Sequence, residues 1–211
     1  MALPPIHGKE PPSAWVRRWA HLLADAQTKA EAKAPQEPQE IALKATPQVL
    51  DVACGHGRHM RFLAGLGFRV LGIDRNAEAL QSASQWGPTL KADIENDDWP
   101  LQNQTFQGVV VTNYLWRELF PNILSSLADE GVLIYETFSH GNASVGKPSR
   151  PDFLLRSGEL LQLCAGLRVI AFEEGFLSSP DRFIQRIVAT KLHPTDGHPT
   201  RYSLPSDTGR E

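Results

Sequence analysis

The sequence has few of the features that mark disulfide-bonded or metal-binding proteins. Only two of its 211 residues are cysteines, Cys54 and Cys164, and they lie far apart. A disulfide framework needs more cysteines than this, so we expect a reduced, cytoplasmic protein. Histidine and cysteine nowhere cluster with the spacing of a zinc site, and we therefore predict no metal.

The charge balance and the hydropathy exclude further classes. The net charge is −3 at pH 7 and the isoelectric point is about 6.2, so no overall positive field attracts nucleic acid. No apolar run approaches the ~20 residues of a membrane span, and residues 1–10 lack a secretory pattern. We expect a small molecule as the partner, rather than nucleic acid or membrane, and the oligomeric state stays open.

The chain divides into a short N-terminal part, one main domain and a tail. Residues 1–40 read as a helix (13–33) and a proline-broken linker. This helix could form a lid over a site or simply pack on the main domain. Residues 41–192 form the main domain, and residues 193–211, rich in Pro, Thr, Ser and Gly, are predicted to be disordered.

Apolar runs and helical segments alternate along the main domain, which predicts an α/β fold. A continuous apolar strand such as 106–112 is typical of a parallel sheet covered on both faces. After a polar loop at 139–152, the last two strands are expected to pair antiparallel. The predicted strands are 48–53, 68–73, 89–92, 106–112, 131–138, 167–176 and 182–191, and the predicted helices are 57–65, 76–86, 117–127 and 156–164.

The most informative stretch is the strand–turn–helix–strand unit at residues 49–74. Gly55 and Gly57 punctuate its turn, where missing Cβ atoms let a ligand approach the backbone. Asp74 ends the second strand, where an acid can accept hydrogen bonds from ribose hydroxyls. The third glycine of the dinucleotide fingerprint is replaced by Met60, and a P-loop is missing. The unit therefore predicts an adenosine-containing ligand and disfavours a nicotinamide-dependent reductase.

The pattern D-x-x-C-G-x-G-R, which begins at Asp51, resembles motif I of the class I S-adenosylmethionine-dependent methyltransferases. The resemblance implies a Rossmann-like fold with a seven-stranded, mostly parallel sheet of order 3-2-1-4-5-7-6 and helices on both faces. It implies S-adenosylmethionine as the cofactor, with Asp74 on the ribose and Asp93 and the next backbone N–H on the adenine edge. The cofactor-binding residues implied by this resemblance are Asp51, Ala53, Gly55, Gly57, Arg58, Asp74, Arg75, Asp93, Ile94 and Asn113.

Two further stretches, 111–117 and 135–161, resemble small bacterial methyltransferases of the tellurite-resistance group. That grouping implies transfer to a small acceptor, with thiols and chalcogen anions among the candidates. Three polar residues end or follow strands at the expected crevice and are candidate catalytic groups, namely Tyr114, Glu136 and His140. Three basic residues could supply a cation for an anionic acceptor and form an electropositive mouth near 147–150, namely Arg117, Lys147 and Arg150.

Several residues also have simpler interpretations, which stay open here. Asp74 could cap a helix, and Arg58 could pair with Asp51 instead of with a cofactor carboxylate. We place His59 on a helix surface or as a capping partner, and Cys54 beneath the turn. The alternative function is a non-catalytic cofactor-binding or partner-docking module that retains the methyltransferase fold.

Overall fold

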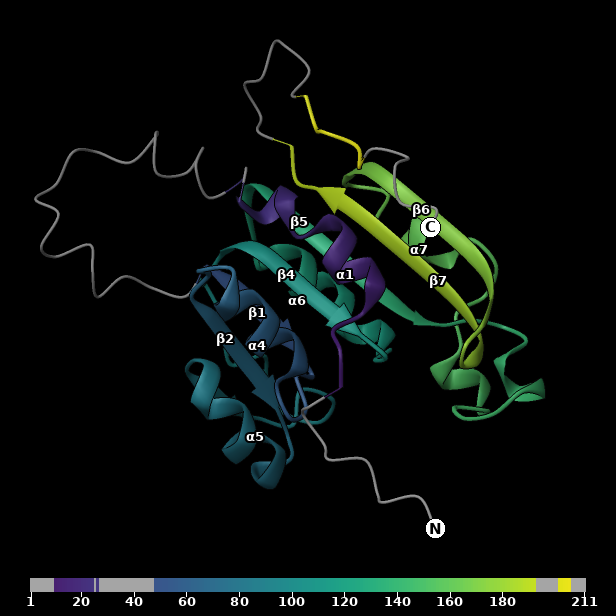
Figure 1. Ribbon diagram of the computed structural model, residues 1–211, viewed down its shortest axis with the longest axis horizontal. Helices are drawn as coiled ribbons and strands as arrows, with labels where there is room; N and C mark the ends of the chain where they lie inside the picture. The colour runs from purple at the N-terminus through teal and green to yellow at the C-terminus, as the bar shows by residue number, and fades with distance from the viewer. Residues whose placement is uncertain (1–9, 25, 27–47, 193–200, 206–211) are drawn as a thin grey trace, which may run out of the picture.

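The computed structural model describes residues 10–24, 26, 48–192 and 201–205 (Figure 1). The predicted linker at 35–39 and most of the predicted tail lie outside the described residues. Within the described ranges, no helix is long and apolar enough to cross a membrane.

Seven strands form a single sheet in the order β3-β2-β1-β4-β5-β7-β6 (Figure 1). Strands β1 to β5 run parallel to one another, whereas β7 runs antiparallel to both β5 and β6. The strand order and the single antiparallel strand expected from the resemblance are confirmed. The strands are β1 (Val49–Val52), β2 (Val70–Asp74), β3 (Thr89–Lys91), β4 (Phe106–Thr112), β5 (Leu127–Phe138), β6 (Arg168–Ser178) and β7 (Asp181–Thr190).

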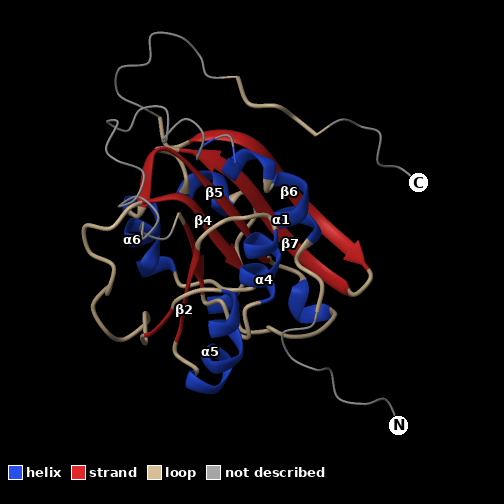
Figure 2. Cartoon of the chain, turned by 60° about the vertical axis from the view of Figure 1, so that its left-hand side comes forward, coloured by secondary structure: helices blue, strands red, loops and turns tan. Residues whose placement is uncertain are grey.

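Helices cover both faces of this sheet, with α1, α4 and α5 on one face and α6 and α7 on the other (Figure 2). The α-helices are α1 (Ala14–Trp19), α4 (Arg58–Gly65), α5 (Ala77–Ala83), α6 (Phe120–Ser125) and α7 (Glu159–Leu163). Short 3₁₀ helices are η1 (Ser84–Trp86), η2 (Arg117–Leu119), η3 (Asn142–Ser144) and η4 (Pro151–Phe153).

The central strand β4 explains why its sequence shows no polar–apolar alternation. Val109 and Val111 pack in the core on the α6 face, and Val110 packs in the core on the α1 face. Because side chains alternate between the faces of a strand, both faces of β4 must be apolar when both are covered. The strand predicted over 106–112 is therefore found with the same bounds.

Helix α1 packs on the sheet through its tryptophans. Ser13 caps the helix as predicted, because its Oγ accepts a hydrogen bond from the Trp15 N–H. Trp15 and Trp19 are buried, with their ring centroids 5.5 Å apart. The Trp15 indole N–H donates to the carbonyl of Ile187 on β7. The described part of the N-terminal helix thus belongs to the main core.

The predicted helix 117–127 is shorter in the structure and is built differently. Residues 117–119 form η2, α6 follows and ends at Ser125, and β5 already begins at Leu127. Leu127 pairs with Phe106, and the register then shifts before Val132 pairs with Gly108. The early start of β5 depends on its pairing with β4, a strand distant in the sequence. The apolar periodicity that predicts a helix carries no information about such pairing.

Gly72 on β2 provides the close helix–strand approach that a third glycine provides in dinucleotide-binding turns. Met60 stands at that turn position and is fully buried. A Cβ at Gly72 would overlap Met60 Sδ and lie 2.8 Å from Cys54 Sγ. The close approach of α4 to the sheet thus depends on a glycine in β2 rather than on one in the helix. The sequence pattern did not predict this arrangement.

We expect Gly72→Ala to lower the free energy of unfolding by about 1–3 kcal/mol, because the added methyl overpacks a full core. Gly166→Ala is the matched control: nothing lies within 4 Å of its Cβ position, so its effect should stay within about 0.5 kcal/mol. Urea denaturation of both variants measures this, and equal stabilities would contradict the packing role of Gly72.

Candidate functional site

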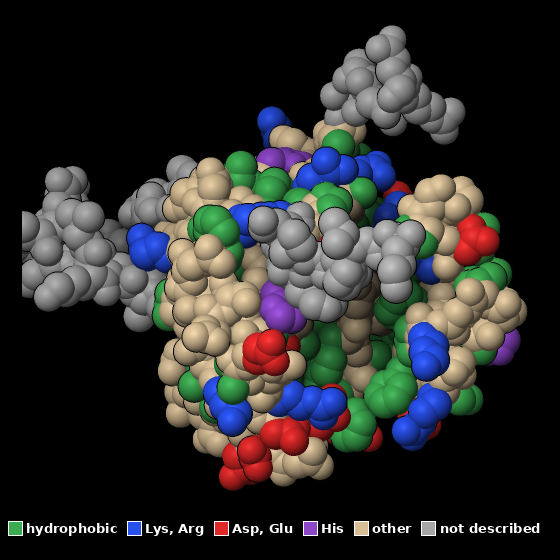
Figure 3. All heavy atoms as spheres, turned by 60° about the horizontal axis from the view of Figure 1, so that its bottom comes forward, with side chains coloured by type: hydrophobic (Ala, Val, Ile, Leu, Met, Phe, Trp, Pro, Cys, Tyr) green, Lys and Arg blue, Asp and Glu red, His purple; other side chains and the backbone are tan. Residues whose placement is uncertain are grey.

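Three adjoining cavities lie at the edge of the sheet where β1, β2, β4 and β5 end. We name them the Asp74, Gly55 and Phe153 cavities, of about 160, 220 and 190 Å³. The side chain of Tyr114, two residues after β4, lines all three. Figure 3 turns this end of the molecule toward the viewer, with hydrophobic side chains in a hollow between charged groups. The cavities together have the placement expected for a ligand of an open α/β sheet.

The Asp74 carboxylate is fixed at the end of β2. Its Oδ2 accepts a hydrogen bond from the Gly55 N–H at 2.8 Å, and its Oδ1 accepts one from the Asn76 N–H at 2.8 Å. The helix-capping interpretation belongs to Asn76 instead, whose Oδ1 accepts from the N–H groups of Glu78 and Ala79. Each Asp74 oxygen keeps a lone pair for a further donor, so the carboxylate can still accept two hydroxyls.

Gly55 and Gly57 have different tasks in the turn after β1. Both have positive φ angles, +55° and +80°. A Cβ at Gly57 would lie 2.9 Å from the Cα of Ala83 on α5, so this glycine is required for packing. A Cβ at Gly55 would meet nothing within 4 Å and would stand at the cavity. Only Gly55 therefore leaves space for a ligand.

Asp51 is buried beneath this turn with one unsatisfied oxygen. Its side chain is 1% exposed, and Oδ2 has no hydrogen-bond partner. Burial raises the Asp51 pKa from 3.8 to about 7, with the Arg58 charge opposing the rise and the Asp74 charge adding to it. A buried, unpaired carboxylate is costly, so a cationic ligand group above it would be favoured.

Arg58 and Cys54 flank the same turn. Arg58, the first residue of α4, lines the Gly55 cavity. Its charge lowers the pKa of Asp51, although the two do not form a close ion pair. Cys54 is buried against Gly72, as predicted, and burial raises its thiol pKa well above the ordinary value. A buried thiol of this kind is not a nucleophile at neutral pH.

His59 is buried, and its predicted location on the helix surface is wrong. The Ser13 N–H donates to its Nε2 at 3.1 Å, and its Nδ1 lies 3.3 Å from Thr112 Oγ1. Since Nε2 accepts, the ring proton belongs on Nδ1. Burial, helped by the Arg58 charge, lowers the His59 pKa to about 3. His59 is therefore a neutral connector between α1, α4 and β4.

The end of β4 is held in a strained conformation. Asn113 has a φ of +55°, and its N–H donates to the Glu136 carbonyl. The Tyr135 hydroxyl donates to the Tyr114 carbonyl at 2.8 Å. The Tyr114 hydroxyl itself is buried without a hydrogen bond. Burial, followed by the nearby Glu95, raises its pKa well above the ordinary value, so Tyr114 stays a protonated donor.

Glu136 points away from the cavities. Its carboxylate is 1% exposed, accepts from Ser13 Oγ and pairs with Arg186 at 3.2 Å. The neighbouring Thr137 lines the Phe153 cavity, because successive residues of a strand face opposite sides. Glu136 is thus a structural ion-pair partner, and the polar group that β5 offers to the cavity is Thr137, which sequence reasoning missed.

The Phe153 cavity has aromatic walls that the sequence did not indicate. Phe138 ends β5, and Phe153 lies in η4 on the loop that follows. These rings line the cavity with Tyr114, Pro148 and Glu95. Nothing in the periodicity of a polar loop identifies Phe153, because its position depends on how the loop folds back.

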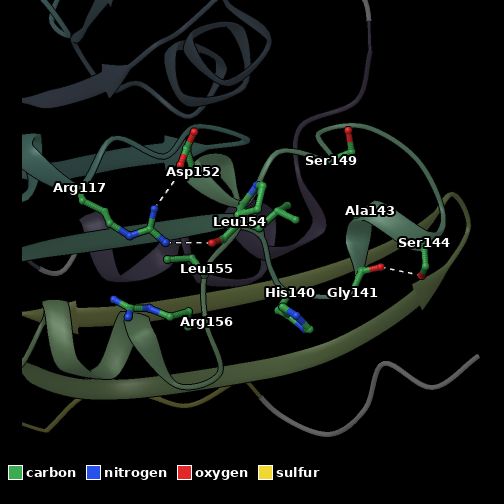
Figure 4. Close-up of a pocket in the computed structure, with 11 residues that line it drawn as sticks. Arg117, His140, Gly141, Ala143, Ser144, Ser149, Asp152, Leu154, Leu155 and Arg156 are labelled. Carbon is green, nitrogen blue, oxygen red and sulfur yellow. Dashed lines mark hydrogen bonds between the residues drawn. The ribbon is translucent and has the colours of Figure 1, made fainter.

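His140 lies elsewhere, in a larger cavity of about 490 Å³ that shares no lining residue with the other three. Figure 4 shows its lining, which includes Arg117, Leu154 and Arg156. His140 is exposed there, and so it is not brought together with Tyr114.

Arg117 anchors residues 152–154 of the loop, which contribute to both the large cavity and the Phe153 cavity. Its Nε and Nη2 bind both oxygens of Glu159 at 2.6 and 2.9 Å. Its Nη1 donates to the Asp152 carbonyl and its Nη2 to the Leu154 carbonyl (Figure 4). The guanidinium is therefore occupied by the protein itself.

The other predicted basic residues are also directed elsewhere. Arg150 pairs with Asp152 at 2.8 Å, and its guanidinium carbon lies 5.1 Å from the Phe153 ring centroid. Lys147 lines none of the four cavities in the described structure. An electropositive mouth near 147–150 therefore receives no support from these side chains. Among the described residues, no three His, Cys, Asp or Glu side chains gather as metal ligands.

Comparisons with known proteins agree with this geometry. Residues 49–131 match the family model described as a methyltransferase domain. The chain is similar in structure to TehB from Haemophilus influenzae, with 20% identity and a TM-score of 0.57 over 72% of this chain and 60% of that one. The aligned part thus spans less than two thirds of TehB.

Two further structures are similar over most of their length. A TehB-like SAM-dependent methyltransferase from Corynebacterium glutamicum has 21% identity and a TM-score of 0.52, over 82% of this chain and 98% of that one. The plantazolicin methyltransferase BpumL, in complex with SAH, has 15% identity and a TM-score of 0.53, over 84% and 87%. No curated protein sequence matches the chain significantly. At these identities the structures establish the shared fold.

We predict that Gly57→Ala mainly lowers stability, whereas Gly55→Ala mainly weakens ligand binding. Gly57→Ala should lower the free energy of unfolding by about 3 kcal/mol, through its left-handed backbone and its overlap with α5. Gly55→Ala should cost only about 1 kcal/mol but weaken S-adenosylhomocysteine binding at least tenfold. Denaturation measures the stability of each variant, and calorimetry measures its affinity for S-adenosylhomocysteine. Equal losses of stability and of affinity in the two variants would contradict the separate roles of Gly57 and Gly55.

Asp51 should make stability depend on pH. Between pH 4 and pH 7 the folded protein keeps a proton that the unfolded chain has released, so stability falls as pH rises and levels off above pH 7. Relative to Asp51→Asn, the wild type should lose about 2–3 kcal/mol between pH 5 and pH 8. Urea denaturation of both proteins at each pH tests this, and a pH-independent difference would show that Asp51 has an ordinary pKa.

Proposed function

We propose that this chain, whose residues 49–131 match a methyltransferase domain, transfers the methyl group of S-adenosylmethionine to a small molecule bound in the Phe153 cavity. The observation that carries this proposal is the arrangement of three adjoining cavities around Tyr114. Two of them suit the methyl donor, and the third suits an acceptor.

The donor half fits the residues in the Asp74 and Gly55 cavities. Asp74, held by two backbone N–H groups, would accept hydrogen bonds from the ribose hydroxyls. Asp93, Ile94 and Arg75 line the same cavity and would surround the adenosine. Asp93 is half-buried, and a hydrogen bond from Asn96 is the main factor lowering its pKa, so it remains a charged acceptor.

The methionine end fits the Gly55 cavity. The open space at Gly55 and the orphaned Asp51 oxygen beneath it suit an ammonium group, and Arg58 suits a carboxylate. Ala53 and Asn113, both with positive φ, line this cavity where β1 and β4 end. Strained backbone of this kind persists where a site requires a particular chain direction.

The chemistry asks mainly for positioning. S-adenosylmethionine supplies a methyl group on a sulfonium that is already a good leaving group. The chain holds the acceptor in line with that methyl, and such orientation can contribute about 7–11 kcal/mol to lowering the barrier. Tyr114, at the junction of the cavities, would orient the acceptor, and the apolar walls exclude water. Glu136 and His140 line none of the three cavities and are not proposed as catalytic.

The small acceptor, the cytoplasmic location and the absence of a nucleic-acid partner remain parts of this proposal. The N-terminal segment is the remaining candidate for a lid. Glu10 lines the Gly55 cavity, and its carbonyl accepts from Arg61 on α4. The chain before α1 therefore borders the methionine end, whereas α1 itself belongs to the core.

Asp74→Ala should weaken the binding of S-adenosylhomocysteine at least tenfold, because the ribose loses its acceptor and the Gly55 N–H loses its partner. Asp98→Ala, at an exposed acid outside the cavities, is the control and should bind as the wild type does. Isothermal titration calorimetry measures both affinities. An unchanged affinity of Asp74→Ala would contradict the proposed donor site. Binding of S-adenosylhomocysteine without turnover of any acceptor would favour the non-catalytic module.

A further inference from the structure

The lining of the Phe153 cavity indicates what kind of acceptor it takes. We propose that the acceptor is an amine carried on a flat, apolar body, such as an arylalkylamine, rather than a thiolate or an oxyanion. This inference rests on the proposed function, since it takes the Phe153 cavity as the acceptor side of a methyl-transfer site.

Three aromatic residues, Tyr114, Phe138 and Phe153, line the cavity together with Leu115 and Pro148. Aromatic faces attract flat rings by stacking and attract cationic nitrogen through their negative faces. They offer nothing comparable to a compact, strongly hydrated anion, which would lose its water without compensation. The walls therefore favour an acceptor with an apolar body and a neutral or positive nitrogen.

Glu95 provides the charged group of the cavity. Its side chain is 21% exposed and lines both the Asp74 cavity and the Phe153 cavity. Its neighbour Arg75 lies 3.5 Å away, is largely exposed and lines only the donor side. The carboxylate therefore remains available to a positive group on the acceptor side, and it repels an anion there.

Positive side chains are missing from the described lining of this cavity. Arg117 is bound to Glu159 and two carbonyls, and Arg150 to Asp152, while Lys147 precedes the lining residue Pro148 but does not itself line the cavity. A thiolate or chalcogen anion would thus meet a carboxylate and three rings instead of a cation.

Polar groups for an amine are present beside the rings. The Tyr114 hydroxyl is buried and has no hydrogen bond, and a buried hydroxyl without a partner is costly. The Thr137 hydroxyl and the Asn113 amide line the same cavity. An amine nitrogen can donate its N–H groups to such oxygens while its lone pair remains free for attack.

The transfer step balances without a strong base. The amine enters in its neutral form, after its ammonium proton has gone to solvent. The nitrogen lone pair forms a bond to the methyl carbon, the carbon–sulfur bond breaks, and its electron pair stays on sulfur. Positive charge passes from sulfur to nitrogen, next to Glu95. A carboxylate placed where positive charge develops stabilises that step, and the product ammonium can then release a proton to water.

The test compares matched probes on the wild-type chain saturated with S-adenosylhomocysteine. Benzylamine, benzyl alcohol and benzoate share one ring and differ in charge, and their binding can be followed by NMR shifts of residues 113–115 and 153. We expect benzylamine to bind at least tenfold more tightly than benzoate and several-fold more tightly than benzyl alcohol. With S-adenosylmethionine, arylalkylamines should gain one methyl group by mass spectrometry, whereas tellurite and benzyl mercaptan should not be methylated.

The variant Glu95→Gln should remove the preference for the amine; because Glu95 also lines the Asp74 cavity, its affinity for S-adenosylhomocysteine is measured first, and the probes are compared at saturation. Glu118→Gln, at an acid in η2 outside the cavities, is the control and should keep the preference. Benzoate binding as tightly as benzylamine, or an amine preference that persists in Glu95→Gln, would overturn the inference. Failure of S-adenosylhomocysteine to bind would instead overturn the proposed function, so the two failures can be told apart.

Discussion

The parallel direction of β1, β2, β4 and β5 is the constraint on which the site depends. Parallel strands end at the same edge of a sheet, and their interiors are apolar on both faces because helices cover both sides. The polar side chains that can reach a ligand therefore lie mainly at and just beyond the strand ends. Asp74, Asn113 and Thr137 come from three different strands and meet at one edge for this reason.

The fold could be predicted, and a donor site proposed, because their signals are local. The turn, the helix and the acid of the donor site lie within one strand–helix–strand unit, residues 49–74, where spacing alone fixes which groups meet. The methyltransferase interpretation of this unit agrees with the match of residues 49–131 to a methyltransferase domain. The Asp74 carboxylate also accepts hydrogen bonds from the N–H groups of Gly55 and Asn76 and so helps to shape the turn. Sequence spacing does not reveal this structural role.

The errors in the predicted site have equally specific causes. Glu136 and Thr137 are neighbours, and choosing between them requires knowing which face of β5 looks toward the cavity. The surface alternative for His59 is wrong because Ser13 and Thr112 approach it from distant parts of the chain, and its ring accepts the N–H of Ser13, the N-cap residue of α1. His140 follows β5 directly, yet the loop turns it into the separate, larger cavity. Each of these outcomes is decided by contacts between residues far apart in sequence.

The clamp formed by Arg117 has a consequence for how the protein can change. Arg117 holds the Asp152 and Leu154 residues by their carbonyls, and only Glu159 by its side chain. A hydrogen bond to a backbone carbonyl does not depend on which side chain the residue carries. The side chain at position 153, between the two anchored residues, can therefore be replaced while the loop stays anchored. The donor side, by contrast, depends on individual glycines and acids. If the Phe153 cavity is the acceptor site as proposed, its preference can change through a few loop side chains while the backbone anchors and the scaffold stay in place.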